Sequence, residues 1–329
     1  MSVYTEVTRD EVQALAVYYA WSVCRLTPIQ AGIENTNYFV QIDQSLLEMQ
    51  DVQELVLTIF EQMSLIDINE LIPLLTYLKQ QGIPVAAPLP DQTGQCIHAI
   101  KNKPAQFAPR LKGQHPLQPT LAQVSQMAST LARLHVTLLN YPLHRDNNHG
   151  QAWWQASKDE LIGQLQADEQ ALLQQVFEQF EQIQQQYPER PSGLIHGDLF
   201  RDNSLFAGDE LTGVLDFSEL SVDELLLDIA ICLNDFCSDW PQVTLDQAKA
   251  QAFIAAYHQY RPLTSDERAA LPTYLAMAAC RFWLSRVQVQ TRNLQEDRQG
   301  EHVLQKDPAE MRRMVQARLD FPFLLQDSL

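Results

Sequence analysis

Residues that could do chemistry are concentrated in one short stretch of the chain, LIHGDLFRDNSLF, between two apolar pairs. Its polar members are His196, Asp198, Arg201, Asp202 and Asn203. Aspartate and asparagine often serve turns through local hydrogen bonds, so each residue alone has a structural explanation. The combination points further, because the apolar segment GVLDF delivers one more acid, Asp216, shortly afterwards.

Asp198, Asn203 and Asp216 together offer the hard oxygen ligands that Mg²⁺ prefers. The apolar neighbours of Asp216 place it at a strand end near the loop, so we expect the three side chains to converge. Kinase-type phosphoryl transfer requires a carboxylate that orients and deprotonates a hydroxyl, and an Asn and an Asp that hold metal on the phosphates. The residue types and their order therefore favour phosphoryl transfer.

Composition limits the classes of partner. The chain has 329 residues, of which 46% are hydrophobic and 19% charged, and its formal net charge is -18. Such an acidic surface repels the nucleic-acid backbone and anionic membranes, and no run of Lys or Arg offsets it. We therefore expect small-molecule substrates, with no nucleic acid and no membrane as partners.

The cysteines and the N-terminal residues bear on the compartment. The five cysteines include no Cys-x-x-Cys pair, and the first residues lack the basic and apolar regions of a signal peptide. No apolar stretch has the length of a spanning helix. These features predict a cytoplasmic protein, and they are compatible with a monomer or a homodimer.

The elements that must position the loop fall into two parts. Hydrophobic periodicity in the first part predicts an antiparallel sheet with a helix over it. Its elements are a helix near 10–21, strands at 25–30, 36–42 and 54–61, a helix near 67–81, and strands at 95–100 and 104–111. Helices dominate after residue 113: 120–139, 157–187, 222–237, 246–260, 265–290 and 308–319, with a hairpin within 203–217. The predicted class is α+β, with a division between 1–108 and 109–329.

The motif HGDLFRDN followed by GVLDF resembles the catalytic and metal-binding motifs of the aminoglycoside-phosphotransferase and choline-kinase superfamily, relatives of the protein kinases. Further segments resemble the homoserine kinases of this superfamily, which are distinct from those with the GHMP fold. These segments are AGIENTNYFV, LVLTIFE, GIPVAAPLPDQTG, KPAQF, LDIAICLNDFC, RFWLSR and KDPAEMRRMVQARL. The resemblance spans nearly the whole chain. It implies a bilobal protein-kinase-like fold and transfer of the γ-phosphate of Mg-ATP to the hydroxyl of a small amino acid, L-homoserine, in threonine biosynthesis.

The resemblance implies roles for the residues of the loop. Asp198 is the base that orients the substrate hydroxyl, and His196 supports the loop by hydrogen bonding. Asn203 and Asp216 hold Mg²⁺. Arg201 either neutralises charge on the γ-phosphate or forms an ion pair with a neighbour such as Asp202.

The N-terminal lobe is expected to bind the nucleotide. AGIENTNYF covers the ATP phosphates with a single glycine, Gly32, and with Asn35 and Asn37 as donors. Val40 and Val56 are expected to enclose the adenine between them.

One position departs from the kinase pattern. Kinases carry a lysine on the third strand, paired with a helix glutamate. Here the aligned strand residue is Thr58, and the helix glutamate would be Glu70. Lys101 or Lys103 could substitute from a neighbouring strand.

An amino-acid acceptor needs a cation for its carboxylate and an acid for its ammonium. Arg281 and Arg286 are candidates for the carboxylate, although both could be structural. Three acids are candidates for the ammonium: Asp235, Asp228 and Glu219. Asp228 could equally bind the backbone of the catalytic loop.

Three alternatives remain at this level. The first is a kinase for choline, ethanolamine, an aminoglycoside or a sugar. The second is a pseudokinase that binds a nucleotide without transfer, which Thr58 alone supports. A glycosidase with paired carboxylates would leave Asn203 unexplained.

Overall fold

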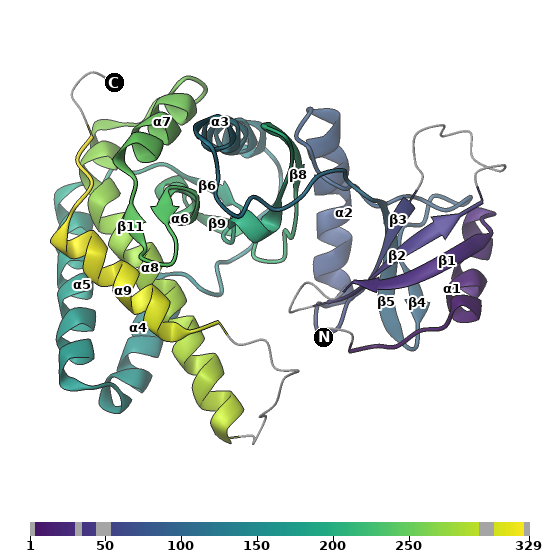
Figure 1. The fold of residues 1–329 in the computed structure, drawn as a ribbon, viewed down its shortest axis with the longest axis horizontal. Coiled ribbons are helices and arrows are strands. Elements are labelled where there is room, and N and C mark those ends of the chain that lie inside the picture. Colours follow the sequence, from purple (N-terminus) through teal and green to yellow (C-terminus); the bar gives the residue numbers. More distant parts are fainter. Residues whose placement is uncertain (1–3, 30–34, 44–53, 296–305, 326–329) are drawn as a thin grey trace. The chain divides into compact units, whose positions relative to one another are not determined.

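The structure is a computed structural model that describes residues 4–29, 35–43, 54–295 and 306–325. Figure 1 shows the elements along the chain. They form two compact units, unit 1 (Met1–Lys112) and unit 2 (Gly113–Gln299 with Gln305–Leu329). The functional division expected after residue 108 stays a prediction.

Unit 1 contains a five-stranded antiparallel sheet with the order β1-β2-β3-β5-β4. The strands are β1 (Val23–Ile29), β2 (Thr36–Ile42), β3 (Glu54–Ile59), β4 (His98–Ile100) and β5 (Lys103–Pro109). The helices of this unit are α1 (Arg9–Ala16), a 3-10 turn (Val17–Tyr19) and α2 (Leu65–Gln80). The predicted sheet and helices are confirmed, with shifts of a few residues at their ends.

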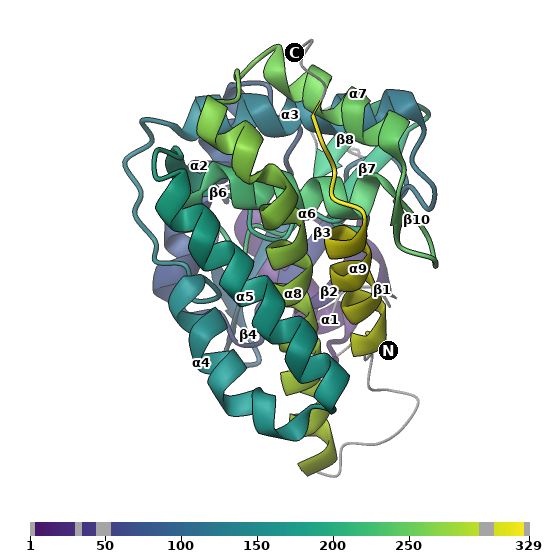
Figure 2. The ribbon, with the colours of Figure 1, turned by 90° about the vertical axis from the view of Figure 1, so that its left-hand side faces the viewer.

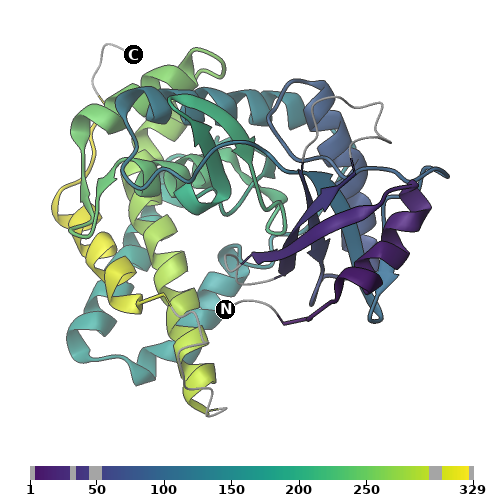
Figure 3. The ribbon, with the colours of Figure 1, turned by 45° about the vertical axis from the view of Figure 1, so that its right-hand side comes forward.

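Alternation along the strands gives the sheet two different faces, because successive side chains point to opposite sides. One face forms the core with α1 and the turn after it (Figure 3), through residues such as Tyr38, Val40 and Leu57. The other face carries half-buried side chains from β2, β3 and β5: Asn37, Phe39, Val56, Thr58 and Gln106. This second face, here called the open face, is the one that could receive a ligand.

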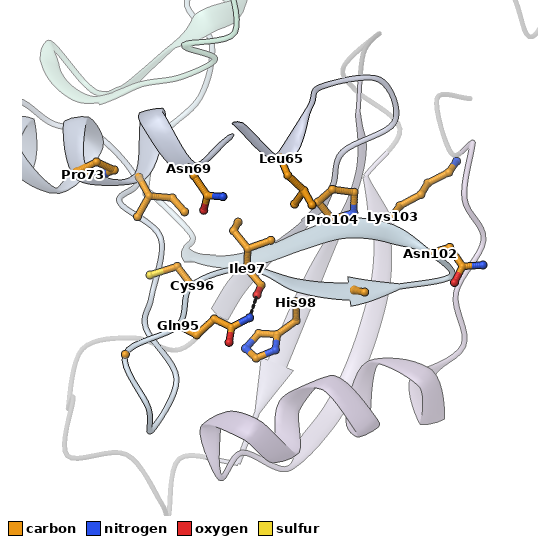
Figure 4. A pocket seen from close by; sticks show the side chains of 13 residues that line it. Leu65, Asn69, Pro73, Gln95, Cys96, Ile97, His98, Asn102, Lys103 and Pro104 are labelled. Carbon is orange, nitrogen blue, oxygen red and sulfur yellow. Dashed lines mark hydrogen bonds between the residues drawn. The ribbon is translucent and has the colours of Figure 1, made fainter. Parts of the chain in front are cut away.

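Helix α2 begins two residues before the predicted start. Ser64 is its N-cap and accepts a hydrogen bond from the Asp67 N–H. The helix buries Ile68, Leu71, Leu74 and Leu78. A cavity of about 580 Å³ is lined by residues of α2 and of the segment around β4 (Figure 4). All its lining residues belong to unit 1, so it contains none of the motif residues of the predicted catalytic loop.

Unit 2 is mostly helical, and α8 (Ser265–Gln295) is its central helix. It packs against α4 (Gln151–Leu161), α5 (Ala167–Gln186), α6 (Leu225–Phe236) and α9 (Pro308–Asp320), as Figure 2 shows. A second pair, α3 (Leu121–Leu138) and α7 (Gln247–His258), packs side by side. Every residue of α6 is buried, which suits a helix that is apolar on most of its surface.

The single helix expected over 157–187 is two helices. A 3-10 turn at Ile162–Gln164 ends α4, and Gln166 then forms a capping box with Glu169 at the start of α5. Ser157, the first residue of the expected helix, is buried inside α4. The break falls in a Gln-rich stretch whose weak periodicity hides it.

Short strands frame the loop of polar residues in unit 2. The strand β6 (Ser192–Ile195) pairs with β9 (Ser221–Glu224), and β7 (Ser204–Ala207) forms the predicted hairpin with β8 (Glu210–Val214), visible in Figure 3. A third pair joins β10 (Ser238–Asp239) to β11 (Thr244–Leu245). The predicted α+β class is confirmed. Within the described parts of the chain, no helix has both the length and the apolar composition needed to cross a bilayer.

Candidate active site

His196 lies fully buried at the end of β6 and ties the loop to the hairpin. Its Nε2–H donates to the backbone oxygen of Leu215 at 2.9 Å, and its Nδ1 accepts the Asp198 N–H at 3.3 Å. Because Nδ1 accepts a hydrogen bond, Nε2 is the ring nitrogen that donates to Leu215. Its ring also contacts Phe217, with 4.8 Å between ring centroids. This is the geometry that the supporting role expected for His196 requires.

Asp228, in the first turn of α6, anchors the loop backbone. Its carboxylate accepts the N–H of His196 at 2.7 Å, the N–H of Gly197 at 3.0 Å, and Nε2–H of His135 at 3.0 Å. Burial would raise the pKa of Asp228, but these hydrogen bonds hold it below its ordinary value. Of the two alternatives for Asp228, binding the loop backbone is therefore the one that the contacts support.

A buried chain of hydrogen bonds continues from Asp228 into the helices. Nδ1 of His135, on α3, lies 2.7 Å from the hydroxyl of Tyr257 on α7, which accepts from Arg261 at 3.1 Å. Arg261 pairs with Glu267. Since the Tyr257 oxygen accepts from Arg261, its own proton is available to His135. Sequence reasoning missed His135 and Tyr257, and the only available signal was a polar residue at a core position of each helix.

Gly197 is required by its backbone and by its surroundings. Its φ is +79°, and an added Cβ would lie 2.8 Å from the backbone oxygen of Glu219. Only glycine adopts this conformation readily, and here the missing Cβ also leaves room for the backbone at Glu219. The glycine therefore allows the loop to turn directly after the two N–H groups that Asp228 holds.

Asp198 and Asn203 are held together across the loop. Nδ2 of Asn203 donates to the Asp198 backbone oxygen at 2.8 Å and to its Oδ2 at 3.0 Å. This leaves Oδ1 of Asn203 as the atom that could bind a cation. Burial raises the pKa of Asp198 to about 8; Arg281 opposes the shift and Asp216 adds to it.

The hairpin brings Asp216 to the same end of the loop, as predicted. Ser204 pairs with Val214 in the hairpin, and the Leu215 N–H donates to the Asn203 backbone oxygen at 2.9 Å. Asp216 follows in a left-handed conformation with φ +58°, exposed, and accepts from the N–H and hydroxyl of Ser218. An amide oxygen and an exposed carboxylate at one hairpin end fit Mg²⁺, which keeps waters and binds phosphates as well.

Arg201 and Asp235 are each other's partners. Asp235, buried on α6, accepts from the N–H of Arg201 at 2.6 Å and from its Nε at 3.0 Å. The guanidinium also donates to the Leu117 oxygen and lies 4.7 Å from the Trp240 ring. The contacts therefore support the ion-pair alternative for Arg201, with Asp235 as the partner. They also correct the assignment of Asp235 to the acceptor ammonium, because its carboxylate is already engaged.

The two arginines predicted for the acceptor carboxylate lie in different environments on α8. Arg286 donates to the Asp307 backbone oxygen at 2.9 Å and to Glu310 at 2.7 Å, so it joins α8 to the start of α9. This helix-joining role does not support a substrate role for Arg286. Arg281 is buried and donates to Glu219 at 2.9 Å. Its charge opposes the rise that burial causes in the pKa of Asp198, so Arg281 lies near that carboxylate.

Residues expected to contact the nucleotide in unit 1 are only partly brought together. The open face carries Asn37 and Thr58, and the Thr58 hydroxyl donates to Oδ1 of Asn37 at 2.8 Å. Asn37 in turn donates to the Asn35 backbone oxygen. Gly32 lies outside the described residues. Glu70 is half-buried on α2.

The structure corrects the assignment of Val40 to the adenine site. Val40 is fully buried in the core on the α1 side of the sheet, whereas Val56 belongs to the open face. One adenine ring cannot contact both, since the two side chains point to opposite sides of the sheet. The neighbouring residue Phe39, which sequence reasoning missed, shares the open face and lies opposite Val56 in the register.

The structure also corrects the expectation that Lys101 or Lys103 replaces the usual strand lysine. Lys103 binds Glu61 and the Thr5 hydroxyl, and Glu61 also accepts from Thr36, a buried residue of the α1 side. Lys101 pairs with Glu11 of α1 at 3.4 Å. Neither lysine therefore takes the place that Thr58 leaves on the open face.

The similarity to known proteins extends over nearly the whole chain. A model of the phosphotransferase enzyme family matches residues 25–263. A homoserine kinase of Polaromonas naphthalenivorans is 36% identical, over 99% of this chain and 100% of that protein. A homoserine kinase of Pseudomonas aeruginosa is 34% identical over the same shares. Among solved structures, an amicoumacin kinase in complex with AMP-PNP and Ca²⁺ superposes with a TM-score of 0.69, at 18% identity, over 98% of this chain and 96% of that one.

Gly197→Ala should lower the free energy of unfolding by at least about 1 kcal/mol, because it adds a backbone clash to an unfavourable φ. Gly208→Ala is the matched control, since Gly208 also has a positive φ, +63°, but open space around its Cα. Urea unfolding of both variants measures the difference. Equal losses of stability would show that the contact with Glu219 has no effect.

Asp228→Asn should cost on the order of 3 kcal/mol at pH 7, because it weakens the hydrogen bonds that three donors make to a buried carboxylate. The folded-state pKa of Asp228 is depressed, so its contribution is complete above the unfolded value near ~4 and is lost as the pH falls through the folded value. The stability difference between wild type and variant should therefore be constant from pH 7 to 5 and shrink below 4. Urea unfolding at each pH tests this, with the exposed Asp209→Asn as control. A difference that grows on acidification would contradict the anchoring charge.

Proposed function

The chain belongs to the phosphotransferase enzyme family, and we propose that it acts as a homoserine kinase, transferring the γ-phosphate of ATP to the hydroxyl of L-homoserine. Full-length relatives with this activity in their names, 34 to 36% identical, support the acceptor. The observation that supports this reaction type is the position of Asn203. Its side chain donates a hydrogen bond to Asp198, and its backbone oxygen accepts one from Leu215, the residue before Asp216. One loop and one hairpin thus present a base and two metal ligands together.

Asp198 is the proposed catalytic residue. Its carboxylate accepts a hydrogen bond from the acceptor hydroxyl and orients the oxygen towards the γ-phosphorus. As the new O–P bond forms and the bond to the β-phosphate oxygen breaks, the hydroxyl proton passes to Asp198 and ADP leaves.

Asn203 Oδ1 and the Asp216 carboxylate are the proposed magnesium ligands. The ion, when bound, neutralises the charge of the nucleotide phosphates. Asn203 has a second role, since its Nδ2 fixes the carboxylate of Asp198. His196 and Arg201 are positioning residues in this proposal, because their hydrogen bonds go to the loop and its supports.

The nucleotide is proposed to use the open face of unit 1. Asn35 and Asn37 supply polar groups, and Phe39 and Val56 supply apolar surface. The hydroxyl of Thr58 holds the Asn37 side chain, which gives the residue at the usual lysine position a task in an active enzyme. Gly32 and Glu70 remain proposed contacts from the family resemblance. The pseudokinase alternative loses its only support if Thr58 serves in this way.

Asp198→Asn should lower kcat with homoserine by about 10²- to 10⁴-fold while ATP affinity changes little, because the amide cannot accept the proton. Asp202→Asn is the control, since Asp202 lies in the same loop but pairs at the surface with Lys306. A coupled assay of ADP release gives kcat, and calorimetry gives ATP affinity. Near-normal turnover of Asp198→Asn would remove Asp198 from the reaction.

Asp216→Ala should abolish the dependence of nucleotide affinity on Mg²⁺, because it removes the only charged protein ligand proposed for the ion. Asp209→Ala, in the turn of the same hairpin, should keep that dependence, since the hydrogen bond that Asp209 makes among the described residues comes from Thr120. Calorimetric titration of ATP with and without Mg²⁺ measures both. Wild-type behaviour of Asp216→Ala would contradict the metal assignment.

A further inference from the structure

Five polar side chains of unit 2 form a connected group beside the catalytic loop, here called the Arg281 cluster: Asn147, His149, Glu219, Asp223 and Arg281. We propose that this cluster binds the acceptor as a zwitterion, with Arg281 on the carboxylate and Asp223 on the ammonium. The proposal rests on the proposed function and specifies how the same site selects an α-amino acid.

Hydrogen bonds connect the cluster from end to end. Arg281 donates to Oε2 of Glu219 at 2.9 Å, and Nδ1 of His149 lies 2.6 Å from the same oxygen. The His149 N–H donates to Oδ1 of Asn147 at 2.8 Å, and Nδ2 of Asn147 donates to Asp223 at 2.6 Å. Asn147 thus fixes the Asp223 carboxylate, and Glu219 fixes the guanidinium.

The backbone holds the two halves of the cluster in place. The Val222 N–H donates to the Arg145 oxygen at 2.7 Å, and Asp146 forms a parallel bridge with Val222. The loop that carries Asn147 and His149 is therefore attached to β9, the strand that carries Asp223. A ligand would meet these side chains in a defined arrangement.

Arg281 has unused capacity for an anion. Its side chain is 6% exposed, and its guanidinium packs over the Phe282 ring at 4.1 Å. In the described part of the chain its only hydrogen bond is the one to Glu219, so Nε and Nη1 retain donors without acceptors. These donors are not among the fully buried polar atoms that lack a partner, so they remain accessible to a ligand, and a carboxylate fits the planar fork of a guanidinium.

Asp223 has the complementary need for a cation. Among the described residues, its two oxygens accept hydrogen bonds only from neutral N–H groups, those of Asn147 and of the Glu224 backbone. Burial raises the pKa of Asp223, and these hydrogen bonds and the charge of Arg281 only partly oppose the shift. The residue is half-buried rather than enclosed, so an ammonium can reach it.

The other acids near Arg281 are accounted for. Asp228 accepts three loop-supporting hydrogen bonds, and Glu219 is held by His149 and Arg281. Asp198 belongs to the reaction. Asp223 is thus the acid left for the ammonium, and its charge and that of Asp198 both act on Arg281. A homoserine molecule could place its hydroxyl at Asp198 and its two charged groups at Arg281 and Asp223.

Two analogues of homoserine separate the two contacts. 3-Amino-1-propanol lacks the carboxylate, and 4-hydroxybutyrate lacks the ammonium, while both keep the hydroxyl. The wild-type enzyme should use each with a kcat/KM lower than that of homoserine by about 10²-fold or more, because each leaves one charged protein group unmatched.

Asp223→Asn should lower kcat/KM for homoserine by about 10²-fold and leave kcat/KM for 4-hydroxybutyrate within about threefold of wild type. Arg281→Gln should also lower kcat/KM for homoserine by about 10²-fold, but it should leave kcat/KM for 3-amino-1-propanol within about threefold of wild type. If loss of the buried arginine prevents folding, Arg281→Lys gives the second comparison. The control is Asp146→Asn, an exposed residue next to Asn147. It should keep the wild-type kcat/KM for homoserine, 4-hydroxybutyrate and 3-amino-1-propanol.

The outcomes separate the inference from the proposed function. If wild type phosphorylates choline and not homoserine, the proposed function fails. If wild type uses homoserine but Asp223→Asn lowers kcat/KM for homoserine and 4-hydroxybutyrate by the same factor, the function stands and the ammonium assignment is overturned. Equal losses with homoserine and 3-amino-1-propanol in the arginine variant would likewise overturn the carboxylate assignment.

Discussion

The carboxylate of Asp228 is the interaction on which the catalytic loop depends. It stands at the start of α6, a helix buried along its whole length, and accepts two consecutive N–H groups of the loop. Consecutive N–H groups can point at one carboxylate only if the backbone turns sharply after them, and Gly197 supplies that turn with its positive φ. The most buried helix of unit 2 thus fixes the direction in which the loop leaves β6, and with it the position of Asp198.

The charged side chains near the loop differ in how many hydrogen-bond and ion-pair partners they have. This difference helps to distinguish residues that hold the structure from residues that could bind a substrate. Asp228 and Asp235 have cationic or multiple donors, so they hold the loop and Arg201 in place. Asp198 accepts a side-chain hydrogen bond from the neutral amide of Asn203, and Nε and Nη1 of Arg281 donate to no residue that the structure describes. In a folded protein such incomplete pairing is unfavourable, and it persists where a substrate supplies the missing charge.

The sequence was sufficient for features that depend on local spacing. Asp198, Asn203 and Asp216 could be associated because a short turn and a two-strand hairpin leave the chain few alternatives. The strand pattern of β2 and β3 was equally clear. The assignment of Val40 failed because it needs the parity of the strand, which decides the face, and a one-residue error moves a side chain from the ligand side to the core.

Features that depend on distant contacts could not be predicted. Nothing in the sequence near Arg201 indicates that Asp235, on another element, would be its partner, since many acids are available in so acidic a chain. The support of Asp228 by His135 and Tyr257 requires α3 and α7 to pack together, which periodicity alone does not reveal. The Asn147–Asp223 contact likewise depends on a loop attached to β9.

Acidity and substrate choice are connected through these same residues. A chain with a net charge of -18 attracts cations in general, so acidity alone would favour choline as readily as an amino acid. What distinguishes the two acceptors is a buried cation, because a quaternary ammonium alcohol has no anionic group to offer it. Burial lowers the pKa of Arg281, and four nearby acids oppose that shift. Glu219 binds Arg281 directly and fixes the direction of its guanidinium. In the proposed binding mode a carboxylate-bearing alcohol completes the pairing of Arg281, and this is a physical reason for an acidic protein to select a zwitterion over a simple cation.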